Sequence, residues 1–160
     1  MRFQPFHLPL LLALTACSET GHSDDCGSIQ PAPPPYARAV KVDDVPFGTS
    51  SNDIPISRTA GTPRTVRIEY AVQRVGGGWC MGLYTGPLTP RFIGLPQGVS
   101  AALDPTSLPA TQSLAETQTL TATLTLAPSI PDGRIALTLV SPEVTGSSMP
   151  TYTLVLTTLR

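Results

Sequence analysis

Histidine, the usual general base of enzymes, is missing from the part of this sequence that can fold into a domain. The chain has two histidines: His7 lies in an N-terminal leader and His22 in a polar segment behind it. A Ser-His-Asp or Cys-His arrangement is therefore excluded in residues 36–160. Zinc sites with histidine ligands are excluded too. Asp43-Asp44 and Asn52-Asp53 could meet at one end of the domain and bind Ca²⁺, but their spacing does not fit an EF-hand loop, and we expect no metal or other cofactor.

Carboxylates are the other side chains that could do acid–base chemistry. Two of them can flank a sugar bond, as in glycoside hydrolases. Asp104 and Asp132 stand beside proline or glycine, as turn formers do, and Glu69 falls on the polar face of a strand pattern. We therefore expect turn and surface acids and no enzyme, with a carboxylate-based glycan hydrolase as the alternative. The candidates are Asp43, Asp44, Asp53, Glu69, Asp104, Glu116, Asp132 and Glu143.

The chain has three cysteines, Cys17, Cys26 and Cys80. No C-x-x-C pair is present, so thiol–disulfide catalysis is not indicated. In an exported protein Cys26 and Cys80 could form a disulfide, which would stabilise the fold by about 2–4 kcal/mol. Two separate thiols, or pairing between chains through Cys26, are the alternatives.

Trp79 and Tyr84 lie in a glycine-rich stretch, residues 76–87, that carries the only tryptophan. Aromatic rings at a loop tip can stack on sugars or anchor a protein partner. This makes the stretch a candidate binding loop. The alternative is that Trp79 folds back and plugs the open end of the domain.

Residues 1–16 are typical of an export signal. Arg2 precedes an apolar run, LPLLLALTA, that is too short to cross a bilayer as a helix. The motif Leu14-Thr15-Ala16-Cys17 resembles the bacterial lipobox. That resemblance implies cleavage before Cys17 and several acyl chains on it, which hold a protein firmly to a membrane. The residue after Cys17 is Ser18 and not Asp, which in lipoproteins of diderm bacteria implies transfer to the outer membrane. The alternative for residues 1–16 is an ordinary signal peptide followed by a chance cysteine.

Residues 17–35 form the segment between this cysteine and the domain. They are rich in Gly, Ser and Asp and end in a proline cluster. Such a composition buries too little apolar surface to fold by itself, and the prolines favour a semi-rigid polyproline II spacer. We interpret the segment as a tether. A proline-rich ligand for a peptide-binding module is the alternative.

From residue 36 onward the patterns are those of strands and turns. Residues 65–75 and 117–126 alternate apolar and polar side chains most regularly, which predicts half-buried strands. Weaker candidates are residues 37–42, 54–57, 91–95 and 99–103; in the last, Val99, Ala101 and Leu103 should point inward. About seven short strands between turn signals indicate an antiparallel β-sandwich. The expected inward sets are Val66, Ile68, Tyr70 and Val72; Leu120, Ala122, Leu124 and Leu126; Ile135, Leu137 and Leu139; and Tyr152, Leu154 and Leu156.

Four motifs follow one another between residues 54 and 160. They are ISRTAGT leading into residues 66–75, GLPQGVSA followed by Leu103-Asp104-Pro105, TLTATLTL, and IPDGRIALTL. Their order resembles that of bacterial immunoglobulin-like domains, although this chain inserts GGGWCMGLYTGPLTP after Val75. The resemblance implies an immunoglobulin-like sandwich that serves as a spacer, stalk, adhesive or glycan-contacting unit. These motifs are structural and bring no active site with them.

The low net charge argues against nucleic acid as a partner. The formal net charge is −1 and only 13% of residues are charged, so no field gathers nucleic acid. We expect a lipid-anchored cell-envelope module, domain 36–160 behind the tether, that binds an envelope protein or glycan without catalysis. A purely structural subunit is a further alternative. It would pair through an exposed edge strand, for which we consider residues 152–159.

Overall fold

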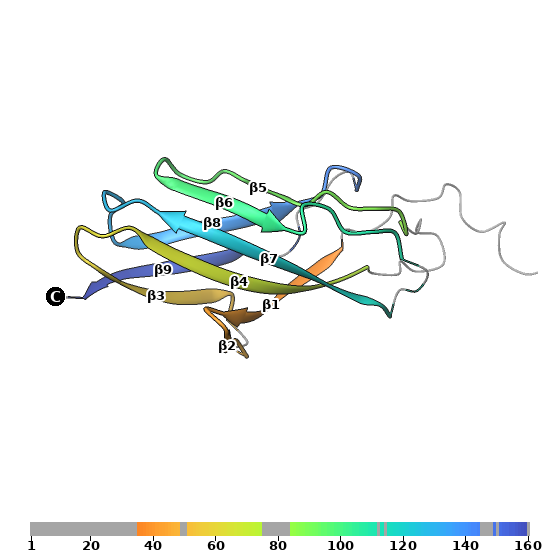
Figure 1. Cartoon of the computed structure of the whole chain (residues 1–160), viewed down its shortest axis with the longest axis horizontal. Helices are drawn as coiled ribbons and strands as arrows, with labels where there is room; N and C mark the ends of the chain where they lie inside the picture. The colour runs from red at the N-terminus through yellow and green to blue at the C-terminus, as the bar shows by residue number, and fades with distance from the viewer. Residues whose placement is uncertain are drawn as a thin grey trace, which may run out of the picture.

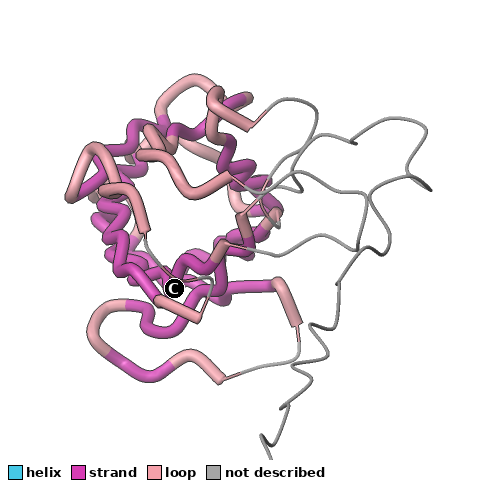
Figure 2. Tube along the Cα trace, turned by 90° about the vertical axis from the view of Figure 1, so that its right-hand side faces the viewer, coloured by secondary structure: helices cyan, strands magenta, loops and turns pink. Residues whose placement is uncertain are grey.

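The computed structural model describes residues 35–48, 51–74, 84–111, 113, 115–144, 149 and 151–159. These residues form strands, turns and loops without a helix, and the strands make two layers (Figures 1 and 2). The described part thus contains no helix that could cross a membrane. The all-β sandwich expected from the sequence is confirmed. Its strands are β1 (Tyr36–Val42), β2 (Val45–Pro46), β3 (Asp53–Thr59), β4 (Arg64–Gln73), β5 (Arg91–Ile93), β6 (Val99–Asp104), β7 (Thr117–Leu126), β8 (Gly133–Val140) and β9 (Tyr152–Leu159).

One sheet has the strand order β2-β1-β4-β7-β6 and the other β3-β9-β8-β5. All neighbouring strands are antiparallel except β3 and β9, which run parallel. A wholly antiparallel sandwich of about seven strands was therefore wrong in two details. No short turn joins β3 to β9, so local sequence does not fix their relative direction. The segment that the sequence did not indicate, β2, is two residues long and leaves almost no periodic signal, whereas the three-residue β5 falls within the weak candidate 91–95.

The C-terminal strand is not an edge. β9 lies between β3 and β8, so the expectation that Tyr152–Leu159 is an exposed edge strand is wrong. Alternation along β9 shows that one face is buried, but it says nothing about which strands lie on either side. The edges of the two sheets are β2 and β6 in one and β3 and β5 in the other.

The core lies between the two sheets, where the four expected inward sets meet. Every member of these sets is at most 6% exposed. The rings of Tyr70 on β4 and Tyr152 on β9 meet edge to face across the core, with centroids 5.7 Å apart. The alternation in the sequence thus predicted the buried face of each of these strands correctly.

β6 is the exception. Its inward-facing residues, Val99, Ala101 and Leu103, were expected to be buried, yet Ala101 is exposed and the other two are only partly covered. The opposite sheet ends in the three-residue strand β5, which is too short to cover a six-residue neighbour. Apolar positions of β6 therefore reach the surface along one side of the sandwich.

Candidate functional site

The edge strands β6 and β5 of the two sheets lie at the top of Figure 1, and neither pairs with a described strand on its outer side; we call this the open side. The Ala127 amide donates to the Gly98 carbonyl at 2.8 Å, in the register that pairs Val99 with Leu126. The backbone groups of Gly98 and of every second residue after it thus point toward β7. Those of Val99, Ala101 and Leu103 point the other way, to the free edge.

A turn fixes the start of this edge. Gly98 has a φ of 86°, a conformation that residues with a side chain rarely adopt, and the Val99 amide donates to the Pro96 carbonyl at 3.0 Å. No described residue hydrogen-bonds to the edge-facing backbone groups of Ala101 and Leu103. The edge therefore offers an N–H and a C=O at each of two positions.

A groove of about 270 Å³ runs beside this edge. Phe92, Leu95, Ala101 and Leu103 give it an apolar lining. Arg91 is the charged residue of the lining, and it has no hydrogen-bond or ion-pair partner among the described residues. Free backbone groups, apolar side chains and an unpaired cation thus share one side of the molecule; the other lining residues are Pro90 and Thr106.

A larger groove of about 400 Å³ lies on the opposite side, between β3 and the β1–β2 hairpin. There part of the strand edge is already occupied by hydrogen bonds or blocked by proline. Among the groups that face away from β9, the Asp53 amide donates to Ser51 and the Ser57 carbonyl accepts from Arg64. Pro55 has no N–H, and the carbonyl of Thr59 accepts from Thr62. Proline and occupied groups are the usual protection of an edge strand, so this groove is a poor site for strand addition.

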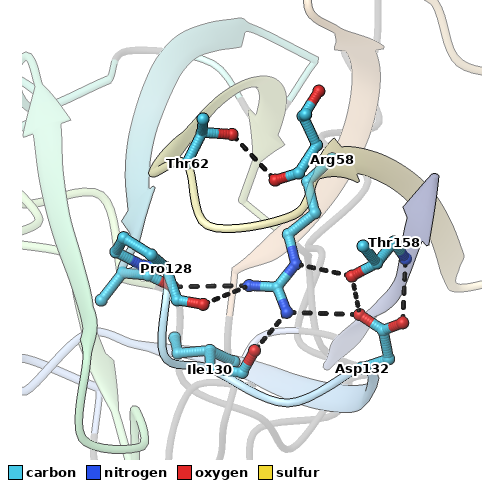
Figure 3. Close-up of polar contacts among 8 residues, drawn as sticks. Arg58, Thr62, Pro128, Ile130, Asp132 and Thr158 are labelled. Atoms are coloured by element: carbon cyan, nitrogen blue, oxygen red, sulfur yellow. Dashed lines mark hydrogen bonds and ion pairs between the residues drawn. The ribbon is translucent and has the colours of Figure 1, made fainter. Parts of the chain in front are cut away.

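Arg58 forms the network of polar contacts that Figure 3 shows. It takes an inward position on β3 and is only 9% exposed. Its Nε donates to Thr158 at 3.1 Å and its Nη2 contacts Asp132 at 3.3 Å. The same guanidinium donates to three backbone carbonyls of the β7–β8 connection: Ala127, Pro128 and Ile130. This buried cation binds its own chain on all sides, so its role is structural.

Two of the candidate acids, Asp132 and Glu143, accept hydrogen bonds from neighbouring residues. Hydrogen bonds from the Thr158 hydroxyl and amide, together with Arg58, lower the pKa of Asp132. Partial burial raises the pKa of Glu143, but hydrogen bonds from Ser141 and Thr89 outweigh it and hold that pKa at about 2. A carboxyl that acts as a general acid near neutral pH needs a raised pKa. The pKa values of Asp132 and Glu143 are lowered, so neither side chain suits that role.

The aspartates that were considered for a calcium site form ion pairs with arginines. The Asp43 carboxylate contacts Arg64, and that of Asp44 lies 3.4 Å from Arg67. Asp53 pairs at 2.6 Å with an arginine of β8. In the part of the chain that the structure describes, no three His, Cys, Asp or Glu side chains gather as metal ligands.

Of the residues singled out for binding, Tyr84 alone can be placed. It is partly buried against the core, its ring lies over Gly86, and its hydroxyl donates to the Pro87 carbonyl at 2.8 Å. Tyr84 therefore packs on its own chain. Cys17, Cys26, Trp79 and Cys80 lie outside the described residues, so the anchor, the disulfide and the tip of the candidate loop stay predictions.

The sequence did not single out the residues of the open side. The alternation Val99-Ser100-Ala101-Ala102-Leu103 marked a strand, and a strand at the edge of a sheet has the same alternation as one inside it. The one available signal was the weakness of the neighbouring segment, residues 91–95, between prolines 90 and 96. Neither protein-family models nor curated protein sequences show a significant match to this chain.

Proposed function

We propose that this protein is a non-enzymatic binding module of the cell envelope, anchored through a lipid on Cys17, which contacts another envelope protein along the open side of its sandwich. The observation that carries the proposal is the edge of β6. Its free backbone groups point outward in the plane of the sheet, and the apolar side chains of the same residues line the groove beside that edge. Protein interfaces are built by covering such edges and patches.

A protein partner is favoured over a glycan at this side. Sugars are commonly bound by exposed aromatic rings with polar groups around them. The groove beside β6 has one aromatic residue, Phe92, which is partly buried against the core. A peptide backbone can use both the free N–H and C=O groups of Ala101 and Leu103 and the apolar lining.

Hydrolysis of a glycan remains the alternative function and has less support. Each described carboxylate except Asp104 forms an ion pair or accepts hydrogen bonds, as Asp43, Asp132 and Glu143 do. Catalysis by two carboxyl groups needs one that stays protonated near neutral pH. The lowered pKa values of Asp132 and Glu143 do not supply it.

The anchor makes a prediction of its own. Replacing Cys17 by Ser removes the thiol that would carry the lipid, and we expect the protein to move from the membrane fraction to the soluble fraction. Immunoblots of fractions from cells expressing each form measure this, with Cys26→Ser as the matched control that keeps Cys17. Retention of Cys17→Ser in the membrane fraction would refute the lipid anchor.

The binding surface is tested by crosslinking in cells. Proline at position 101 removes an N–H that faces away from β7, so the sheet keeps its hydrogen bonds while the free edge is blocked. We expect Ala101→Pro to lose a crosslinked protein that the parent and Ala102→Ser both retain, as mass spectrometry of the purified adducts would show. If Ala101→Pro keeps that protein and Trp79→Ala loses it, the partner binds through residues 76–87 and the proposed surface is wrong.

A further inference from the structure

We infer that the open side of the sandwich takes an extended peptide segment, which adds to the sheet as a strand beside β6 and places an acidic side chain next to Arg91. The inference rests on the proposed function and names the chemistry of the partner. Three features of the described residues carry it: the direction of the backbone groups, the apolar groove and the charge of its lining.

The backbone of β6 sets the form of the partner. Ala101 and Leu103 present free N–H and C=O groups at alternate positions, and the Val99 amide is already bonded to Pro96. Only a chain in the extended conformation has donors and acceptors at the same spacing. Asp104-Pro105 ends the available edge, so the added strand is short.

The groove sets the side-chain pattern of the partner. Residues of an added strand alternate between the outer face of the sheet and the interior side. Those on the interior side would lie next to Leu103, Phe92 and Leu95, where β5 is too short to cover the space. We therefore expect apolar residues at every second position of the bound segment.

Arg91 sets the charge of the partner. It is exposed, lines the groove and has no partner among the described residues. Asp104, the nearby carboxylate on β6, belongs to the alternate set of residues on the outer face of the sheet. A carboxylate carried by the bound segment would complement Arg91 and accept charge-assisted hydrogen bonds from it.

The same charge argues against a second copy of this chain as the occupant. Two β6 strands could pair antiparallel about Ala101, but the residues that line the groove include an arginine and no acid. Each copy would then bring a cation to the shared side without a carboxylate to meet it. A segment with apolar residues at alternate positions and an acid satisfies all three features.

The test uses the lipidated full-length chain in nanodiscs and a phage-displayed library of random ten-residue peptides. We expect the enriched peptides to carry apolar residues at alternate positions and an Asp or Glu. A synthetic peptide of the enriched sequence should bind Ala101→Pro at least tenfold more weakly than the parent and bind Ala102→Ser normally. Arg91→Glu should weaken binding about tenfold and favour the same peptide with Lys in place of its acid.

Three results would overturn the inference: no enriched peptide, equal binding to Ala101→Pro, or a parent chain that dimerises in solution and becomes monomeric as Ala101→Pro. Failure here can be separated from failure of the proposed function. A crosslinked partner that depends on Ala101 but contains no such segment leaves the binding module intact and refutes only the strand-addition chemistry.

Discussion

Replacing Arg58 by Met should destabilise the domain by about 3–5 kcal/mol, the cost typical of breaking a buried charged network. Met keeps most of the aliphatic stem but removes every donor. The carbonyl of the buried Ile130 then loses a hydrogen-bond partner where water has little access, and the partly buried bonds to Ala127 and Pro128 are lost with it. Asp132 suffers less, because its side chain is 46% exposed and can be hydrated.

Urea denaturation of the parent and the variant measures this loss. Arg134→Met is the matched control, since Arg134 also pairs with an aspartate but its side chain is 63% exposed. Exposed ion pairs contribute at most about 1 kcal/mol, so this control should unfold close to the parent. If both variants lose the same small amount of unfolding free energy, the hydrogen bonds of Arg58 stabilise the domain no more than those of a surface arginine.

Replacing Tyr152 by Phe should cost about 1–3 kcal/mol, because it leaves a buried N–H without an acceptor. The Ala39 amide of β1 donates to the Tyr152 hydroxyl of β9 at 2.9 Å, across the two sheets. The register of β1 against β4 shifts between Ala39 and Lys41, so this amide lies where the ladder is irregular. The hydroxyl therefore completes the hydrogen bonding of a bulge in the other sheet.

Tyr36→Phe is the control for this prediction. Tyr36 is 46% exposed and stands at the start of the same strand, so loss of its hydroxyl should change stability by less than about 0.5 kcal/mol. Thermal unfolding followed by near-ultraviolet circular dichroism compares the two variants. A Tyr152→Phe protein as stable as Tyr36→Phe would mean that the Ala39 amide finds another acceptor.

The fold was largely predictable because burial repeats every second residue. In β4 and β7 the apolar side chains at alternate positions all proved buried, and the predicted bounds of β7 agree with the structure. The inward position of Arg58 after Ile54 and Ile56 was not recognised, because a charged residue in that place looks like the end of a strand. Only the carbonyls of a distant connection explain why it is buried.

The candidate site was less predictable, for a different reason. Whether a strand has an open edge depends on which strands lie beside it. The sequence of β6 has no feature that indicates that β5 is short. Aromatic residues drew attention instead, and Tyr84 packs on its own chain. The strand order supplied what periodicity could not: which of several similar strands stands at the margin of its sheet.

The parallel pairing of β3 with β9 also sets the order in which the domain can assemble. Partners such as Arg58 and Thr158 are 100 residues apart, so β3 finds its partner in the four-stranded sheet only when β9 is present. A chain that emerges from a ribosome or a translocation channel with its N-terminus first holds β3 unpaired until β9 has emerged. Contacts this distant in sequence also slow folding. The four-stranded sheet therefore closes only after β9 is released.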